Sequence, residues 1–329
     1  MNATASPIIR VDQISKIYRP RHSLGNAQPA APVVALNHVS LDIRPGEIFG
    51  LVGGSGSGKT TLGRLLVKLE KADSGHVYLH GQDTTGLRGR ALKALRARVQ
   101  MVFQDPYQSL NPQLTIFETV AEPLIVHRAG DQDVRVKKVA DVLTTVGFHP
   151  AEDYFSRYPH ELSGGQRQRA AIARAMVLDP EFIVADEPTS MLDATSSFQI
   201  FKILSDLREK NRVAFLFITH SLAAANFLCD RIAVIYHGNL VEMGPARQVI
   251  QHPAHPYTMA LIDALPAYCQ HAACRFYNAL METDRQLPDQ DHCPFFVSCR
   301  RADPDQCATR QPAMTPLTDT HSVACFKAG

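Results

Sequence analysis

The sequence Ile48-Phe49-Gly50-Leu51-Val52 runs directly into Gly53-Gly54-Ser55-Gly56-Ser57-Gly58-Lys59-Thr60, and this stretch decides the fold. It fits the pattern G-x-x-x-x-G-K-[ST], with an apolar strand predicted before it and a helix predicted after it. Glycines allow successive N–H groups to point at phosphate oxygens, and the start of the helix adds its positive end. Lys59 would bring charge to the β- and γ-phosphates, and the Thr60 hydroxyl can ligate Mg²⁺. The stretch therefore predicts a nucleotide site.

Short apolar runs alternate with segments of helical period through most of the chain, which is typical of an α/β fold. Residues 182–185 and 213–218 are candidates for buried strands. Residues 232–236 and 240–243 are predicted to form a hairpin through His237-Gly238-Asn239. After the phosphate loop, leucines at i, i+3, i+4 and i+7 predict one face of a helix: Leu62, Leu65, Leu66 and Leu69.

Two carboxylates, Asp186 and Glu187, follow the predicted strand at residues 182–185. Asp186 would hold Mg²⁺ through water, and Glu187 would orient or deprotonate the attacking water. Acidic residues are also common where a strand runs into solvent, so this interpretation depends on the phosphate loop upstream.

A second helix start has the composition of an anion site. Ser163-Gly164-Gly165-Gln166 precedes a strongly helical stretch through Leu178. Serine is a good helix cap, and the two glycines expose N–H groups at the positive end of the helix. A second anion site is unexpected in a chain that binds one nucleotide, and spacing alone leaves a simple capped helix as an alternative.

Bulk composition excludes several classes of protein. The 329 residues carry a net charge of +2, so no large basic field favours nucleic acid as the main partner. The first residues lack the pattern of a secretion signal, and the longest apolar runs are far shorter than the ~20 residues that span a bilayer. Of seven cysteines, six fall between Cys269 and Cys325, which in a cytosolic chain favours a metal or cluster site over disulfides.

Six motifs in this order resemble the ATP-binding subunits of ABC transporters. They are the phosphate loop, Gln104 after residues 99–103, Ser163-Gly164-Gly165-Gln166, Asp186-Glu187-Pro188, Ser190-Met191-Leu192-Asp193 and His220. The resemblance implies an ATP hydrolase with a RecA-like phosphate-loop core, an antiparallel β subdomain and a helical subdomain at about residues 106–160. It implies a nucleotide-binding domain at residues 1–252, followed by a small Cys-containing extension at residues 253–329.

The resemblance also assigns roles to residues. In this family two nucleotide domains pack head to tail, so the signature Ser163-Gly164-Gly165-Gln166 would close on ATP held by another chain. Glu187, His220 and Gln104 would be catalytic, and Tyr18 would stack on adenine. Further ATP contacts are implied for Gly53, Gly54, Ser55, Gly56, Ser57, Gly58, Lys59, Thr60, Thr61, Gln104 and Asp186, and Mg²⁺ contacts for Thr60, Gln104 and Asp186.

The tail resembles that of dipeptide, oligopeptide and nickel importer ATPases, through His255-Pro256-Tyr257-Thr258 together with Tyr158-Pro159-His160 and Ser109-Leu110-Asn111-Pro112. This implies peptide uptake, with nickel or another small solute as alternatives. The implied partners are a related second ATPase chain, two membrane permease subunits and an extracytoplasmic solute-binding protein. The implied location is peripheral, at the cytoplasmic face of the inner membrane. A soluble ABC ATPase acting on ribosomes or DNA is the alternative of another class, although relatives with ribosome roles usually carry two nucleotide domains.

Four cysteines of the tail match a set that binds a [4Fe-4S] cluster in some relatives. They are Cys293, Cys299, Cys307 and Cys325, with gaps of five, seven and seventeen residues. Four thiolates are the usual ligand set of such a cluster. Zinc is a competitor, but structural zinc sites typically use closer pairs. Thiols without a metal are the third alternative, and Cys269 and Cys274 are interpreted as incidental.

Overall fold

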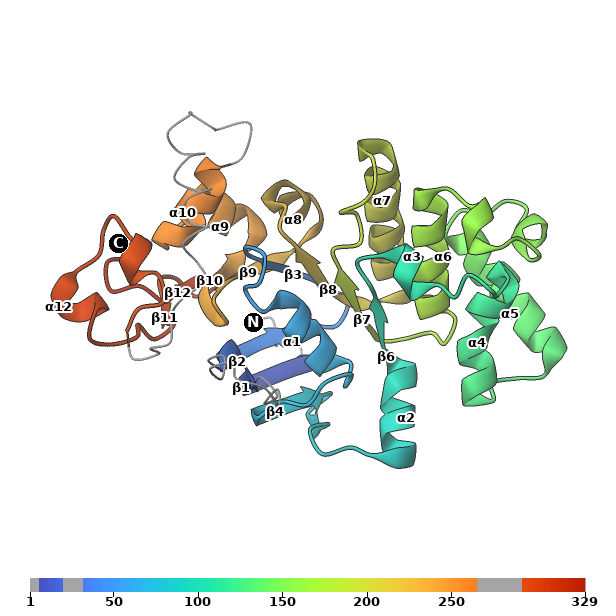
Figure 1. Ribbon diagram of the computed structural model, residues 1–329, viewed down its shortest axis with the longest axis horizontal. Coiled ribbons are helices and arrows are strands. Elements are labelled where there is room, and N and C mark those ends of the chain that lie inside the picture. The colour runs from blue at the N-terminus through green and yellow to red at the C-terminus, as the bar shows by residue number, and fades with distance from the viewer. Residues whose placement is uncertain (1–5, 20–31, 265–291, 329) are drawn as a thin grey trace, which may run out of the picture.

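The computed structural model describes residues 6–19, 32–264 and 292–328. Two sheets and a group of helices make up the molecule (Figure 1). Residues 20–31 lie outside the described residues, as do Cys269 and Cys274.

The smaller sheet is antiparallel, with strand order β2-β1-β4-β5. Ile9, Val11 and Ile14 of β1 are buried. They belong to the same hydrophobic cluster as Phe49 of the main sheet. The end of β1 places Tyr18 beside the phosphate loop. The strands are β1 (Ile9–Tyr18), β2 (Val33–Ile43), β4 (Ser74–Leu79) and β5 (Gln82–Asp83).

The larger sheet has the order β11-β12-β10-β9-β3-β8-β7-β6, and its central strands β9, β3, β8, β7 and β6 are parallel. Every residue of β3, β7 and β8 is buried, as expected for parallel strands covered on both faces. Their carboxyl ends therefore meet at one edge, where loops carry polar residues. The strands are β3 (Ile48–Val52), β6 (Val99–Val102), β7 (Phe182–Asp186), β8 (Ala214–Thr219), β9 (Arg231–Tyr236), β10 (Asn239–Pro245), β11 (Thr315–Pro316) and β12 (Ser322–Val323).

A mainly helical part lies at one end of the main sheet, and the C-terminal residues lie at the other end (Figure 1). From Pro106 to Glu161 the described elements are all helices, and α6 packs on α3, α4 and α5. These helices are α3 (Pro106–Ser109), α4 (Ile116–His127), α5 (Gln132–Thr145), the 3-10 turns η1 (Glu152–Tyr154) and η2 (Pro159–Glu161), and α6 (Gly164–Met176).

The remaining helices flank the sheets or follow them. α1 lies between the two sheets, where Leu62, Leu65 and Leu66 are buried. These helices are α1 (Lys59–Leu66), α2 (Gly89–Arg98), α7 (Ala194–Asn211), α8 (Leu222–Leu228), α9 (Ala246–Gln251), α10 (Pro256–Asp263), η3 (Phe296–Ser298) and α12 (Pro304–Cys307).

The predicted α/β class with an antiparallel sheet and a helical part is confirmed, as is the hairpin, formed by β9 and β10 around His237 and Gly238. The prediction for Leu69 is wrong. The helix α1 ends at Leu66, Lys68 adopts a left-handed conformation with φ 57°, and the side chain of Leu69 is half exposed. The chain has turned away before the fourth leucine of the pattern.

The C-terminal residues join the main sheet, because β12 pairs with β10 in antiparallel fashion. Glu242 on β10 is fully buried and accepts N–H groups from Ala254 and His255, while His321 lies 2.8 Å from its carboxylate. One buried carboxylate thus ties β10 to both the start of the tail and its end. The predicted limits of the nucleotide-binding domain (1–252), its helical subdomain (about 106–160) and the C-terminal extension (253–329) stay a prediction.

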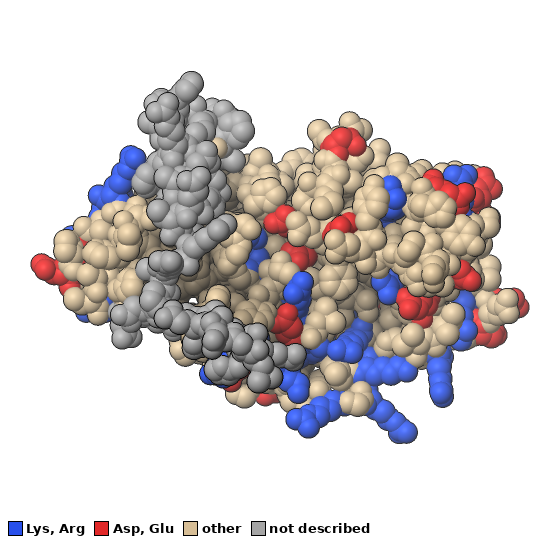
Figure 2. Space-filling model, viewed as in Figure 1, with Lys and Arg blue, Asp and Glu red and all other residues tan. Residues whose placement is uncertain are grey.

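Charge is unevenly spread over the face shown in Figure 2, where Lys and Arg side chains gather at the lower edge over α2. The basic residues of α2 are Arg90, Lys93, Arg96 and Arg98. Of these, Arg98 is paired with Glu181. Within the described ranges, no helix has both the length and the apolar character needed to cross a membrane.

Candidate nucleotide site

The phosphate loop connects β3 to α1 in a conformation that requires glycine. Gly58 has φ 103°, and a Cβ there would lie 2.2 Å from the carbonyl oxygen of Ala35. The Lys59 side chain is buried and folds back over the loop, donating to the carbonyls of Gly53 at 2.9 Å and Gly54 at 2.6 Å. Burial lowers the pKa of Lys59, and the nearby carboxylates Glu187 and Asp186 oppose this shift. The ammonium group is therefore held, largely desolvated, at the N-terminus of α1.

The last residue of β7 supplies a carboxylate beside this loop. Asp186 is buried, and the Thr60 hydroxyl donates to its Oδ1 at 3.1 Å. Burial raises the pKa of Asp186, and the hydrogen bond from Thr60 opposes this shift. A hydroxyl and a carboxylate oxygen side by side form a donor set that suits Mg²⁺.

Glu187 begins the next turn and meets two polar side chains from neighbouring strand ends. Its backbone is left-handed, with φ 43°, and its N–H donates to the carbonyl of Ile218 at 2.9 Å. The Glu187 Oε2 accepts from Gln104 Nε2 at 3.2 Å and lies 3.2 Å from His220 Nδ1. Gln104 follows β6 and His220 follows β8, so the parallel order of the sheet brings the three together.

Apart from Asp186, these groups line one cleft of about 560 Å³ between the two sheets. The ring of Tyr18 forms part of its wall, while the Tyr18 hydroxyl donates to Glu70. Predicted site residues that line the cleft are Tyr18, Gly54, Ser55, Gly56, Gly58, Lys59, Thr60, Thr61, Gln104, Glu187 and His220. Gly53, Ser57 and Asp186 are buried and do not line it.

The second predicted anion site lies elsewhere. Ser163 caps α6 by accepting from Gln166 N–H at 3.2 Å, and the Gln166 side chain accepts from Ser163 N–H at 2.9 Å. Neither they nor the two glycines line the cleft of the phosphate loop. A Cβ on Gly165 would meet Ser196 at 3.0 Å, so this helix start lies against the first turn of α7, which Asp193 caps.

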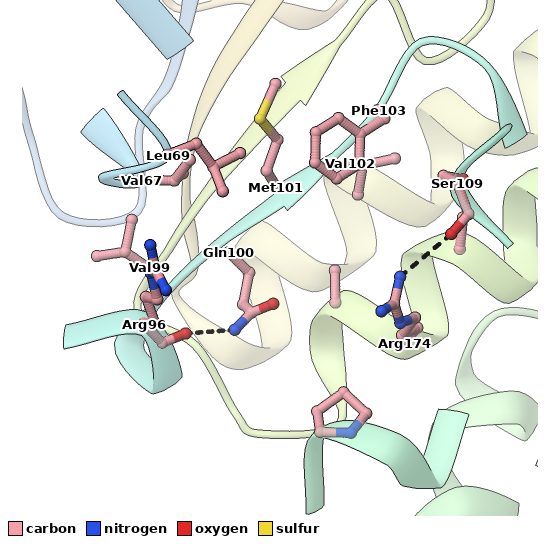
Figure 3. Close-up of a pocket in the computed structure, with 13 residues that line it drawn as sticks. Val67, Leu69, Arg96, Val99, Gln100, Met101, Val102, Phe103, Ser109 and Arg174 are labelled. Carbon is pink, nitrogen blue, oxygen red and sulfur yellow. Dashed lines mark hydrogen bonds between the residues drawn. The ribbon is translucent and has the colours of Figure 1, made fainter. Parts of the chain in front are cut away.

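A smaller groove of about 190 Å³ runs between β6 and the helices α4 and α6 (Figure 3). Leu69, Met101 and Phe103 supply apolar surface at one side of it. Arg174 donates to the carbonyl of Ser109 at 3.3 Å at the other side. The half-exposed Leu69 thus lines this groove, close to the segment that carries Gln104.

One contact of the phosphate loop could not be found from sequence. The Gly54 N–H donates to the hydroxyl of Tyr257 at 2.8 Å, across 203 residues of chain. The sequence singles out His255-Pro256-Tyr257, but only as a resemblance. No spacing rule connects this segment with the loop.

The four predicted tail cysteines come from three short segments that fold together. The Cys293 N–H donates to the carbonyl of Cys307 at 2.9 Å. The sulfurs of Cys307 and Cys325 accept N–H groups from Asp303 and Lys327, each at 3.4 Å.

Burial raises the pKa of the Cys293 thiol to about 11, and the neighbouring thiols Cys307, Cys299 and Cys325 add to the shift. The pKa values of Cys299 and Cys325 are also raised, first by burial. Nevertheless, the part of the chain that the structure describes contains no group of three His, Cys, Asp or Glu side chains placed to hold a metal ion.

Comparisons with known proteins agree with this geometry. Residues 36–190 match the model of the ABC transporter family, and residues 241–307 match the oligopeptide/dipeptide transporter C-terminal region. The di/tripeptide transport ATP-binding protein DppF of Pseudomonas aeruginosa is 40% identical over 91% of each chain. The oligopeptide transport ATP-binding protein OppF of Bacillus subtilis is 43% identical over 72% of this chain and 78% of its own.

Among solved structures, the dimeric ATP-binding cassette MJ0796 bound to ADP and Pi has a TM-score of 0.64 and 31% identity, covering 73% of this chain and 99% of that one. Together with the site, these similarities define the class: the chain is an ATPase of the ABC transporter family. Within that family it belongs to the group whose members carry the oligopeptide/dipeptide transporter C-terminal region.

Proposed function

We propose that this chain is the motor subunit of a membrane importer and couples ATP hydrolysis to the uptake of peptides. The single observation that carries the motor role is the cleft where Lys59, Thr60 and Glu187 converge from separate elements. The peptide assignment is supported by the names of DppF and OppF and by the matching C-terminal region. Nickel import and a soluble role on ribosomes or DNA are not favoured by these relatives.

At the cleft, Lys59 and the N–H groups of the loop would bind the β- and γ-phosphates. Thr60 and Asp186 would hold Mg²⁺, with Gln104 near it, and the ion would neutralise charge that develops on the phosphate oxygens. Glu187 would orient the attacking water and take its proton. The contacts of Gln104 and His220 with the Glu187 carboxylate would fix its direction.

The separate position of Ser163-Gly164-Gly165-Gln166 supports a head-to-tail pair of nucleotide domains. An anion-binding helix start that does not line the cleft of its own chain can serve the cleft of a partner. We propose that the partner is a related ATPase chain. MJ0796, a structural neighbour of this chain, is described as dimeric.

We further propose two permease subunits as partners, one of which docks on the groove of Figure 3. The apolar side chains of this groove lie close to Gln104 along the same segment. A helix of a permease would find there both apolar surface and a direct path to the nucleotide site. An extracytoplasmic binding protein would deliver the solute. The basic residues of α2 suit the anionic lipids of a cytoplasmic membrane face, which is the proposed location.

For the tail, the proposal is a [4Fe-4S] cluster on Cys293, Cys299, Cys307 and Cys325. It is supported by the electrostatic influence of these thiols on one another and by the N–H donors to two of the sulfurs. Such donors stabilise thiolates, which the raised pKa values otherwise disfavour.

The hydrolysis role is tested by Glu187→Gln. Because this change keeps the shape of the side chain but removes the base, we expect ATP affinity to stay within about twofold. Turnover should fall by at least about 100-fold. Glu181→Gln is the matched control, since Glu181 pairs with Arg98 outside the cleft. Hydrolysis near the wild-type rate would remove Glu187 from its role.

The peptide assignment is tested with the same variant in cells. Uptake of a labelled dipeptide or oligopeptide should stop with Glu187→Gln and continue with Glu181→Gln. Uptake that continues with Glu187→Gln, while uptake of another solute stops, would contradict peptide import and leave the ATPase assignment unaffected.

A further inference from the structure

Tyr257, from the C-terminal region, reaches the phosphate loop directly. Its side chain is 2% exposed, and its hydroxyl accepts the Gly54 N–H at 2.8 Å inside the protein. Gly54 is the second residue of the loop, immediately after the buried Gly53. Since this N–H points to Tyr257, it is not directed at the cleft. The hydrogen bond therefore fixes the base of the loop and leaves the later N–H groups for phosphate.

The position of Tyr257 is itself fixed by its neighbours in sequence. The His255 Nδ1 accepts the Tyr257 N–H at 3.0 Å and so caps α10, while Pro256 takes the first helical position. The His255 N–H donates to the buried Glu242 at 2.9 Å. The motif His255-Pro256-Tyr257 thus has a physical meaning: a cap, a helix start and a tyrosine directed at the phosphate loop.

The ring of Tyr257 links the loop to the cysteine-containing segment. Its centroid lies 4.4 Å from that of Tyr236 on β9 and 5.6 Å from that of Phe295. Phe295 is buried and follows Cys293 by two residues. Tyr257 and Phe295 therefore belong to a group of buried, mutually tilted rings between Gly54 and the segment that carries Cys293.

From this arrangement we infer that Tyr257 is a positioning residue of the nucleotide site, through which the C-terminal region holds the phosphate loop in its binding conformation. This inference rests on the proposed ATP-binding role of the loop. Loss of the hydroxyl leaves the buried Gly54 N–H without its partner, so the binding conformation becomes less populated. Apparent affinity falls in proportion to that population, whereas the catalytic groups Glu187 and His220 are untouched.

The test is Tyr257→Phe in the 329-residue chain, which removes one oxygen and keeps the ring contacts. We expect the dissociation constant for MgATP to rise about three- to tenfold. The turnover rate at saturating ATP should stay within about twofold of the wild type. Tyr78→Phe is the matched control, because Tyr78 lies on β4 in the other sheet. A purely structural role would lower the melting temperature and the active fraction without changing the affinity of intact sites.

Phe295→Leu tests the link to the tail. It should weaken MgATP binding in the same direction, and its effect should not add to that of Tyr257→Phe, because both act through one contact. Unchanged affinity in Tyr257→Phe would overturn the inference while leaving the proposed function intact. A wild-type chain that binds no MgATP would instead overturn the proposed function, so the two failures are distinguishable.

Discussion

Single residues of the phosphate loop could be predicted because backbone geometry restricts their chemistry. A glycine at position 58 is required by its left-handed backbone and by the Ala35 carbonyl, and lysine is required to reach phosphate. The contact of Tyr257 with Gly54 could not be predicted, since 203 residues separate the two and only the folded chain brings them together. Local rules find residues whose role depends on their neighbours in sequence, and they miss partners from elsewhere.

His255 shows how burial alone changes the chemistry of a residue. It is 1% exposed, and burial lowers its pKa to about 3, so the ring is neutral and can accept the Tyr257 N–H. Sequence alone does not reveal this protonation state, because a surface histidine in the same motif would titrate near pH 6.5.

A pH dependence of stability follows from this shift. His255 takes up its proton near pH 6.5 in the unfolded chain and only near pH 3 in the folded chain. The contribution of neutral His255 to the free energy of unfolding is therefore complete above pH 6.5 and is lost as the pH falls toward 3. Between pH 8 and pH 5 this loss amounts to about 2 kcal/mol. His255→Asn keeps a capping acceptor without the titration. Urea unfolding at both pH values should show a smaller difference for the variant, and an equal difference would exclude His255 as the cause.

Elements with a strong apolar pattern could be predicted from the sequence, whereas the ends of helices and the short strands could not. The buried strands β3, β7 and β8 appear in sequence as continuous apolar runs. The helix α1 ends before Leu69 because the backbone turns at Lys68, which a leucine pattern does not reveal. The strands β11 and β12 have two residues each, too few for any alternation to be recognised.

The C-terminal segment that carries the four cysteines leads to a prediction about metal content. Anaerobically purified protein should show a broad visible absorption shoulder and about four irons per chain. Both should be lost in Cys299→Ser and kept in Cys229→Ser, because Cys229 lies beside Gly50 and is not one of the four proposed ligands. A colourless, iron-free wild type that still hydrolyses ATP would contradict the cluster and leave the motor role intact.

On the scale of the whole molecule, one chain carries two glycine-rich helix starts that do not share a cleft. Lys59 and the start of α1 face the cleft between the sheets, whereas Gly165 at the start of α6 lies against α7. The sequence already indicated two such sites, because each consists of a glycine-rich helix start. Their separation depends on the packing of the helical part on the main sheet, which no local pattern encodes.

This separation predicts that the two sites fail in different ways. Lys59→Ala should abolish MgATP binding by the isolated chain, because it removes the cation of the phosphate loop. Gly164→Asp adds a Cβ that meets only Leu192 at 3.6 Å, and its charge suits the helix terminus, so the fold should be kept. The same charge would repel a phosphate brought by a partner chain.

We therefore expect Gly164→Asp to leave the MgATP affinity of the isolated chain within about twofold. Steady-state hydrolysis by the assembled pair should fall by at least about tenfold, because a carboxylate then occupies the position where a terminal phosphate must bind. Fluorescent-nucleotide titration of the single chain and a phosphate-release assay on the assembly measure the two quantities separately. Weakened binding in the isolated Gly164→Asp chain would place the signature at the cleft of its own chain, and a head-to-tail pair would then no longer be needed to explain it.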